Sequence, residues 1–228
     1  MPKPEGPQFF GRRKGRPLRT QAKTLMDTKL AEISISQLSD DVVDGEALFS
    51  HQPADIFLEI GFGGGEHMAA LAAAQPEAGF IGAEPFVNGV ASLLRHIDDQ
   101  NLDNIRIWPD DVRLILPQLK TDLLAGAYIM FPDPWPKRRH ASRRILNQPM
   151  LGALSRLIKP GGHLRMASDH PEAKIWLLAE AMEHKDFIWQ AKAPSDWQNR
   201  PDDWPQTRYM AKGVKEGRPS SWFDFIRI

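Results

Sequence analysis

Short apolar runs alternate with segments of helical periodicity along most of the chain. The runs predict buried strands, and apolar residues spaced three and four apart predict helices. The predicted strands are 56–60, 79–83, 104–108, 126–131 and 162–167. The predicted helices are 68–74, 86–98, 112–119, 145–158 and 172–183. Successive strand–helix units of this kind predict the α/β class, with a Rossmann-like, doubly wound and mostly parallel sheet.

The last part of the chain departs from this pattern. A strand is predicted over 187–191, and the alternation of apolar and polar residues over 222–228 predicts a final antiparallel strand at the edge of the sheet. The connection 192–219 contains several prolines and is predicted to be irregular. Long irregular connections inside a compact domain are usually functional, so we expect this one to contact the substrate.

The N-terminal segment differs from the rest. Residues 1–23 are rich in proline, glycine and basic residues and lack apolar periodicity. This composition predicts an extended arm that becomes ordered on binding a partner. We therefore expect a basic, flexible arm over residues 1–25 and a single domain over 26–228.

The composition excludes several kinds of chemistry. The absence of cysteine excludes disulfides and cysteine nucleophiles and is typical of a reducing compartment. The chain has neither the apolar region of a secretory signal nor a run of about 20 apolar residues that spans a membrane. We expect a cytoplasmic protein without membrane contact. The seven histidines show no metal-binding spacing and no catalytic-triad pattern, so no metal is expected.

The formal net charge is zero, but the charges are unevenly distributed. The arm is basic, and residues 137–144 hold five lysines and arginines without an acid. Such patches meet phosphate groups in nucleic-acid-binding proteins, although a run of charge is also common on an ordinary solvated face.

A glycine loop follows the first predicted strand. It reads Glu59-Ile60-Gly61-Phe62-Gly63-Gly64-Gly65-Glu66, and its glycines allow a ligand to approach the backbone. A dinucleotide-binding loop requires glycine at position 66, where the charge of Glu66 would instead face a pyrophosphate. The loop therefore disfavours NAD.

Carboxylates stand at or after three predicted strands, namely Glu59, Glu84 and Asp111. The carboxyl ends of parallel strands meet at one edge of the sheet, where ligands of open α/β folds bind. Each acid alone is equally consistent with a helix cap. Together they favour a cationic ligand such as S-adenosylmethionine over NAD, whose phosphates are anionic.

A proline-rich segment, Phe131-Pro132-Asp133-Pro134-Trp135-Pro136-Lys137, follows the fourth predicted strand. The prolines predict a stiff platform that resembles the Asn/Asp-Pro-Pro-aromatic motif of amino- and base-directed methyltransferases. Trp135 either stacks on a base or packs within the protein. With His140 and Arg143-Arg144, the segment resembles the bacterial tRNA (guanine-N7)-methyltransferase family.

This resemblance extends from the Gly11–Arg16 arm to Thr207-Arg208-Tyr209. It implies a class I methyltransferase fold with a C-terminal antiparallel strand, and transfer of a methyl group from S-adenosylmethionine to N7 of a variable-loop guanosine in tRNA. The implied catalytic residue is Asp133, and the implied cofactor-binding residues are Glu59, Gly61, Gly63, Gly65, Glu84, Asp111 and Asp133. The implied substrate-binding residues are Lys137, Asp169, Thr207, Arg208, Tyr209 and Met210. The implied RNA contacts are Arg139, His140, Ser142, Arg143 and Arg144.

The chain departs from the family at Met210, where the family's Thr-x-x-Glu segment has glutamate. We expect methionine to accept no hydrogen bond there, so guanine recognition would fall to Asp169 or to backbone carbonyls. Two alternatives remain open at this level, methylation of another substrate such as an amine and RNA binding without catalysis. The three carboxylates disfavour a mere RNA-binding protein. The sequence is compatible with a monomer or a homodimer.

Overall fold

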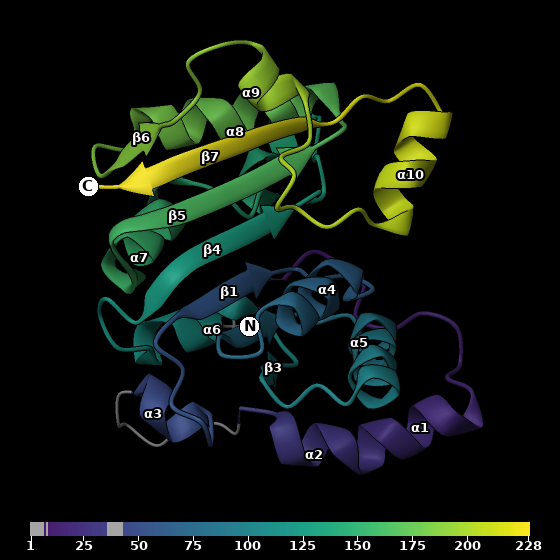
Figure 1. Ribbon diagram of the computed structural model, residues 1–228. Helices are drawn as coiled ribbons and strands as arrows, with labels where there is room; N and C mark the ends of the chain where they lie inside the picture. The colour runs from purple at the N-terminus through teal and green to yellow at the C-terminus, as the bar shows by residue number, and fades with distance from the viewer. Residues whose placement is uncertain (1–6, 8, 36–42) are drawn as a thin grey trace, which may run out of the picture.

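The computed structural model describes residues 7, 9–35 and 43–228, and within them one seven-stranded sheet organises the chain (Figure 1). The strands lie in the order β3-β2-β1-β4-β5-β7-β6. Neighbours from β3 to β5 are parallel, and β7 is antiparallel to both β5 and β6. The strands are β1 (Ile56–Ile60), β2 (Gly79–Ala83), β3 (Ile105–Trp108), β4 (Leu124–Met130), β5 (Ile158–Ser168), β6 (Phe187–Trp189) and β7 (Ser221–Arg227). The predicted mostly parallel sheet with a C-terminal antiparallel strand is confirmed.

Helices cover both faces of the sheet. They are α1 (Thr20–Asp27), α2 (Lys29–Ile33), α3 (Gly45–Leu48), α4 (Glu66–Ala74), α5 (Val87–Gln100), α6 (Val112–Ile115), α7 (Gln148–Leu157), α8 (Pro171–Glu183), α9 (Ser195–Gln198) and α10 (Arg208–Lys215), with 3-10 turns η1 (Leu116–Gln118) and η2 (Arg138–Arg143). One apolar cluster joins the strands to α6, α7 and α8, and a second joins them to α1, α4 and α5.

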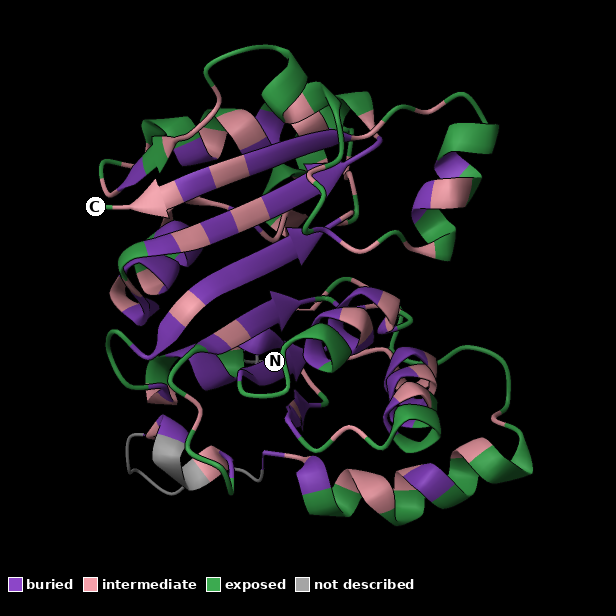
Figure 2. Ribbon diagram, in the orientation of Figure 1, coloured by how far each residue is buried: buried purple, intermediate pink, exposed green. Residues whose placement is uncertain are grey.

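Alternation along the strands separates these two clusters. Leu58 lies in the first cluster, whereas Phe57 packs against the second, because successive side chains of a strand point to opposite faces. The central strands β1 and β4 are almost wholly buried, as Figure 2 shows. Glu59 therefore lies on the face of β1 that is covered by α4 and α5.

The boundary between α7 and β5 differs from the prediction. The helix begins at Gln148 because the side chain of Asn147 caps it, accepting a 3.0 Å hydrogen bond from the Met150 N–H. The strand begins at Ile158, earlier than predicted, and its pairing with β4 shifts register before His163. A bulge that includes Gly161, in the left-handed region at φ 82°, accounts for this shift.

The expectation of an edge position for the last strand is wrong. Strand β7 lies between β5 and β6, so the short β6 forms that edge of the sheet. The alternation in β7 reflects its two faces, since Phe223 and Phe225 are buried while Asp224 is partly exposed on the other face. A half-exposed interior strand and an edge strand therefore show the same sequence pattern.

The two segments predicted to be irregular contain helices. The connection 192–219 contains α9 and α10, and α1 begins at Thr20, inside the predicted arm. Leu25 of α1 is buried in the cluster formed with α5, which explains why this part of the basic segment is helical. None of the helices in the described ranges is long and apolar enough to cross a membrane.

Residues 9–19 have no helix or strand but are held against the start of α5. The Val87 N–H donates to the carbonyl of Arg13 at 2.9 Å. The side chain of Asn88 accepts from the Gly15 N–H at 2.7 Å and donates to the carbonyl of Arg16 at 2.8 Å. These backbone contacts bring the arm to the carboxyl edge of the sheet.

Candidate active site

The parallel strands end on the right of Figure 1. Two adjoining cavities are lined by residues at and after these strand ends. The larger has a volume of about 360 Å³ and the smaller about 340 Å³, and both are lined by Gly61 and Phe131. Of the predicted site residues, the larger cavity is lined by Gly61, Glu84, Asp111, Asp133, Arg143 and Arg144. The smaller is lined by Glu59, Gly61, Gly63, Gly65, Thr207, Tyr209 and Met210. Lys137, Arg139, His140, Ser142, Asp169 and Arg208 line neither cavity.

The glycine loop supplies a floor shared by both cavities. Gly61 and Gly63 have φ values of 72° and 54°, and a Cβ atom on either would meet no other atom within 4 Å. Their hydrogens therefore face open space, as a loop that receives a ligand requires. Gly65 is different, because a Cβ there would come within 2.6 Å of Leu93 in α5. Close packing of α4 on α5 thus also demands glycine at position 65.

Glu59 lies near the end of β1 and is almost completely buried. One carboxylate oxygen, Oε2, accepts a 2.8 Å hydrogen bond from Nδ1 of His67. The other oxygen has no hydrogen-bond partner in the described part of the chain. Glu59 caps no helix, so a capping role does not explain this acid.

Glu84 follows β2 and ties two loops together. Its Oε2 accepts from the Gly63 N–H at 2.8 Å, and its Oε1 accepts from the Phe86 N–H at 2.9 Å. Burial raises the pKa of Glu84, and the nearby charges of Asp133 and Glu59 raise it further against the lowering effect of the two hydrogen bonds. Each oxygen keeps a lone pair for a ligand hydroxyl.

Asp111 combines a capping role with a position at the larger cavity. It is the N-cap of α6, where its side chain accepts from the Arg113 N–H at 3.0 Å. It also forms a 2.6 Å ion pair with the Arg113 guanidinium. The capping alternative is therefore correct for Asp111, and the same carboxylate lines the larger cavity beside Glu84.

The proline-rich platform is held in a constrained backbone conformation. Phe131 and Trp135, on either side of Asp133, have positive φ values of 52° and 36°. Non-glycine residues rarely adopt this left-handed region, and such strain is typically retained at functional sites. The carbonyl of Pro134 accepts a 3.3 Å hydrogen bond from Trp176 Nε1, which anchors the segment to α8.

Asp133 is exposed at the larger cavity. Among the residues that the structure describes, no hydrogen bond or ion pair joins its carboxylate. The platform therefore presents an unneutralised charge beside Glu84, whose pKa it raises. A cationic ligand in this cavity would be stabilised by both acids.

Trp135 is partly exposed, lines the larger cavity and packs against neighbouring side chains. The Arg143 guanidinium lies 4.9 Å from its ring and 4.8 Å from the ring of Phe10, so the arginine contacts both aromatic side chains. The His140 ring meets Trp135 edge-on at 5.7 Å. Arg144 donates a 3.5 Å hydrogen bond to the Trp135 carbonyl. These contacts show that Trp135 packs against its neighbours, and stacking on a base stays a prediction.

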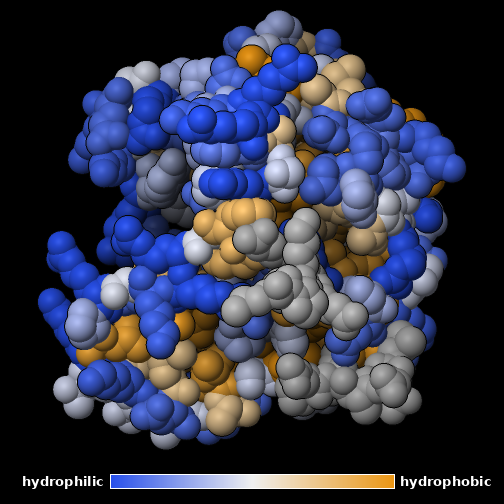
Figure 3. All heavy atoms as spheres, turned by 180° about the vertical axis from the view of Figure 1, so that it is seen from behind, coloured by the Kyte–Doolittle hydropathy of each residue, from blue (hydrophilic) through white to orange (hydrophobic). Residues whose placement is uncertain are grey.

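The side chains of residues 137–144 form a mostly basic outer surface. Lys137, Arg138, Arg139 and Ser142 are exposed, whereas Arg143 and Arg144 are partly buried against aromatic rings. Desolvation and the positive charges of Arg143, Arg139 and Lys137 lower the pKa of His140. Hydrophilic side chains predominate on the left of Figure 3, which is the carboxyl edge seen from behind.

Helix α10 begins with a capping box in which methionine takes the usual place of glutamate. Thr207 accepts from the Met210 N–H at 3.3 Å, and the Met210 sulfur accepts from the Thr207 N–H at 3.4 Å. The expectation that Met210 accepts no hydrogen bond is therefore wrong. Met210 is buried with Trp204 and Trp222, so it also fixes α10 to the domain.

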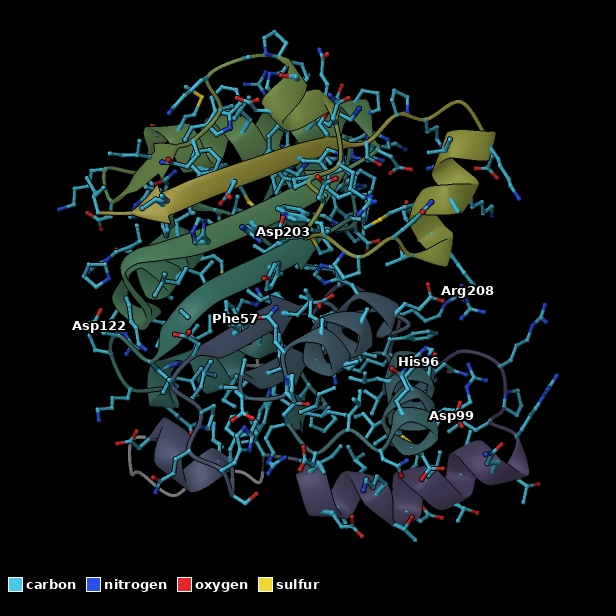
Figure 4. All side chains as sticks on the ribbon, viewed as in Figure 1. Phe57, His96, Asp99, Asp122, Asp203 and Arg208 are labelled. Atoms are coloured by element: carbon cyan, nitrogen blue, oxygen red, sulfur yellow. The ribbon has the colours of Figure 1, made fainter. Side chains whose placement is uncertain are left out.

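Two further contacts hold α10 over the glycine loop. Both the backbone N–H and the guanidinium of Arg208 donate to Glu66, and Figure 4 shows the Arg208 side chain reaching from α10 toward α4 and α5. The Tyr209 ring packs 4.9 Å from Phe131, and its hydroxyl donates to Asp169 at 3.2 Å. Asp169 is also paired with Arg218, so both of its carboxylate oxygens have protein partners.

The arm supplies site residues that the sequence did not indicate. Phe9, Phe10 and Arg12 line the larger cavity, and Arg13 forms a 2.8 Å ion pair with Asp110. The adjacent phenylalanines in an otherwise polar segment were an available signal, because solvated arms rarely carry paired aromatic residues. No cluster of three or more metal-ligating side chains occurs in residues 9–35 and 43–228.

The chain resembles solved structures in its fold. It matches the 16S rRNA (adenine(1408)-N(1))-methyltransferase from Catenulisporales acidiphilia with a TM-score of 0.55 and 13% identity, covering 84% of this chain and 96% of the other. It matches the 16S rRNA methyltransferase KamB with a TM-score of 0.52 and 13% identity, covering 86% and 99% respectively. At this identity, the likeness establishes the fold alone.

Sequence relatives identify the family more closely. A family model described as "Putative methyltransferase" matches residues 53–221. The tRNA (guanine-N(7)-)-methyltransferase of Rhodospirillum rubrum is 45% identical, covering 98% of this chain and 89% of the relative. The proteins of the same name from Agrobacterium fabrum and Brucella anthropi are 42% and 41% identical, each covering 96% of this chain and 94% of the relative. Because these matches extend over nearly the whole chain, it belongs to the tRNA (guanine-N(7)-)-methyltransferase family.

Proposed function

We propose that this enzyme transfers a methyl group from S-adenosylmethionine to N7 of a guanosine in the variable loop of tRNA. The observation that carries the proposal is the convergence of Glu59, Glu84 and Asp111 on cavities that meet at the glycine loop, beside the unneutralised Asp133. The relatives' printed name supports tRNA and guanine N7 as the substrate and the atom.

The cavities suit this methyl donor. Open space above Gly61 and Gly63 leaves room for a ligand against the backbone. Glu59 faces the smaller cavity with one free oxygen for an ammonium group, and Glu84 faces the larger with lone pairs for ribose hydroxyls. When bound, S-adenosylmethionine supplies an electrophilic methyl group on a sulfonium centre. The acidic surroundings stabilise that positive charge.

Catalysis at N7 requires little acid–base chemistry. The N7 lone pair of neutral guanine is free to attack, so the protein's main task is to position the base. The purine ring gains positive charge during the transfer, and the Asp133 carboxylate stabilises that charge. The constrained backbone from Phe131 to Trp135 places Asp133 at the larger cavity.

The outer basic surface supports a polyanionic substrate. Lys137, Arg138 and Arg139 are exposed on the segment that follows Asp133, where phosphates of a bound RNA would neutralise them. A small amine substrate has no use for such a surface. This contrast favours tRNA over an amine as the methyl acceptor.

Transfer of a labelled methyl group to an unmodified tRNA transcript tests the proposal. The purified protein is incubated with labelled S-adenosylmethionine and the transcript, and the RNA is digested to nucleosides. We expect the label to elute as 7-methylguanosine. Label in a nucleoside methylated on an exocyclic amine, or no transfer to any guanosine, would refute the assignment.

A further inference from the structure

A buried histidine supports the carboxylate at the start of the glycine loop. His67 lies in the first turn of α4 and, like Glu59, is only 4% exposed. Its Nδ1 lies 2.8 Å from Glu59 Oε2. Because a carboxylate only accepts hydrogen bonds, Nδ1 carries the hydrogen and donates it. The imidazole thereby fixes which oxygen of Glu59 remains free at the smaller cavity.

This contact is the histidine's one polar contact in the described part of the chain. Its Nε2 is buried without a hydrogen-bond partner, and its ring lies edge-on to Tyr128 at 5.1 Å. An apolar side chain in this position would avoid an unpaired buried nitrogen. Packing alone therefore does not favour histidine, whereas holding Glu59 in a set orientation does.

We propose that His67 is a positioning residue, which holds the Glu59 carboxylate in the orientation that binds the ammonium group of the methyl donor. The inference rests on the proposed function, in which Glu59 meets that ammonium. His67 acts through Glu59, so its contribution depends on the amino-acid part of the ligand. The adenosine part lies beside Glu84 and Asp111 and does not depend on it.

Two adenosine ligands distinguish binding of the amino-acid part from binding of the adenosine part. S-adenosylhomocysteine carries the ammonium group, whereas 5′-methylthioadenosine lacks the amino-acid tail. Calorimetry with purified His67→Leu protein is expected to show about tenfold weaker binding of S-adenosylhomocysteine, as befits one lost hydrogen bond to a charged group. Binding of 5′-methylthioadenosine is expected to remain at the wild-type value.

A matched variant and a matched site provide controls. Asparagine is close to leucine in size and places a donor near the position of Nδ1, so His67→Asn should regain most of the lost affinity. His163 forms the same kind of pair with Asp224, also at 2.8 Å, but lines neither cavity. His163→Leu should leave both affinities unchanged. In Glu59→Gln protein, the His67→Leu change should have little further effect on S-adenosylhomocysteine binding.

The outcomes separate this inference from the proposed function. Equal loss of both ligands in His67→Leu protein, or loss of neither, would overturn the positioning role even if the wild-type enzyme methylates tRNA. Selective loss of S-adenosylhomocysteine, restored by asparagine, supports it. If that selective loss is found but wild-type protein forms no 7-methylguanosine, the positioning role stands and the proposed RNA substrate is wrong.

Discussion

At the scale of single residues, Glu84 shows a conflict between stability and ligand binding. Burial raises its pKa above the usual 4.5, and the charges of Asp133 and Glu59 add to this effect. Its favourable contribution to folding is therefore present below pH 4.5 and is lost as the pH rises through the raised pKa. At neutral pH the ionised carboxylate weakens the ligand-free fold. A cationic ligand offsets that cost by neutralising the acidic cluster.

We propose that turnover depends most on Asp133. Changing Asp133→Asn removes the charge but keeps the shape, so kcat for tRNA methylation should fall about 100-fold. The dissociation constant of the methyl donor should change much less, because Glu59, Glu84 and Asp111 remain. Single-turnover kinetics with saturating donor measure the effect directly.

Asp122 offers a matched control for that change. It is an exposed carboxylate at the opposite end of β4, as Figure 4 shows, and its φ of 54° is a conformation that asparagine tolerates. Asp122→Asn should keep the wild-type rate. A nearly normal single-turnover rate in Asp133→Asn protein would remove Asp133 from the catalytic role.

Prediction from sequence was limited at the residue scale by contacts between distant segments. The convergence of Glu59, Glu84 and Asp111 was predictable, because parallel strands place their carboxyl ends at one edge. The contact of Arg143 with Phe10 was not, since it joins the platform region to the arm. The hydrogen bond that the Met210 sulfur accepts from the Thr207 N–H was also not predictable, because methionine rarely acts as the acceptor in a capping box.

At the scale of secondary-structure elements, α10 is attached to the glycine loop mainly by polar contacts. Arg208 binds Glu66 at the start of α4, and Tyr209 contacts both Phe131 and Asp169. The helix was not predicted, because prolines before it and polar residues within it resemble an irregular connection. Its anchoring comes from buried Met210 and from these tertiary contacts.

Glu66→Gln tests whether the ion pair holds α10 in place. Although partial burial raises the pKa of Glu66, hydrogen bonds from the Arg208 backbone and guanidinium lower it overall from 4.5. The contact therefore stabilises α10 fully above pH 4.5, and this contribution is lost as the pH falls from 4.5 through the lowered pKa of Glu66. At pH 7, the neutral glutamine should increase amide hydrogen exchange in α10 and leave exchange in β1 and β4 unchanged.

The pH dependence provides the check on that variant. As the pH is lowered from 4.5 through the lowered pKa of Glu66, the amide hydrogens of α10 in the wild-type protein should lose protection from exchange. Their protection should then approach that in Glu66→Gln protein at the same pH. If α10 has the same protection in both proteins at pH 7, the Glu66–Arg208 contact does not hold the helix.

At the scale of the whole molecule, the site is assembled from three separate stretches of chain. The arm contributes Phe9 and Phe10, the strand ends contribute the carboxylates, and the C-terminal part contributes α10. The fold class was predictable from strand–helix alternation, whereas the interior position of β7 was not. The arm's path was not, because its placement depends on hydrogen bonds to Asn88 and Val87 of α5.

The hydrophilic carboxyl edge in Figure 3 and the exposed Lys137, Arg138 and Arg139 suit the approach of a large polyanion to this site. An RNA that neutralises these residues would lie beside Asp133, because Asp133 and the basic residues all belong to the segment that follows β4. The donor cavity, the charged platform and the proposed RNA surface therefore lie at one edge of the sheet.

Mapping the methylated position in tRNA tests this account most directly. Borohydride reduction followed by aniline cleaves RNA at 7-methylguanosine, because the charged ring is open to reduction. After incubation of an unmodified tRNA transcript with the enzyme and S-adenosylmethionine, we expect one cleavage, at a guanosine of the variable loop, and none without the donor. Methyl incorporation without any cleavage would contradict transfer to N7, and cleavage confined to another region would contradict the variable-loop assignment.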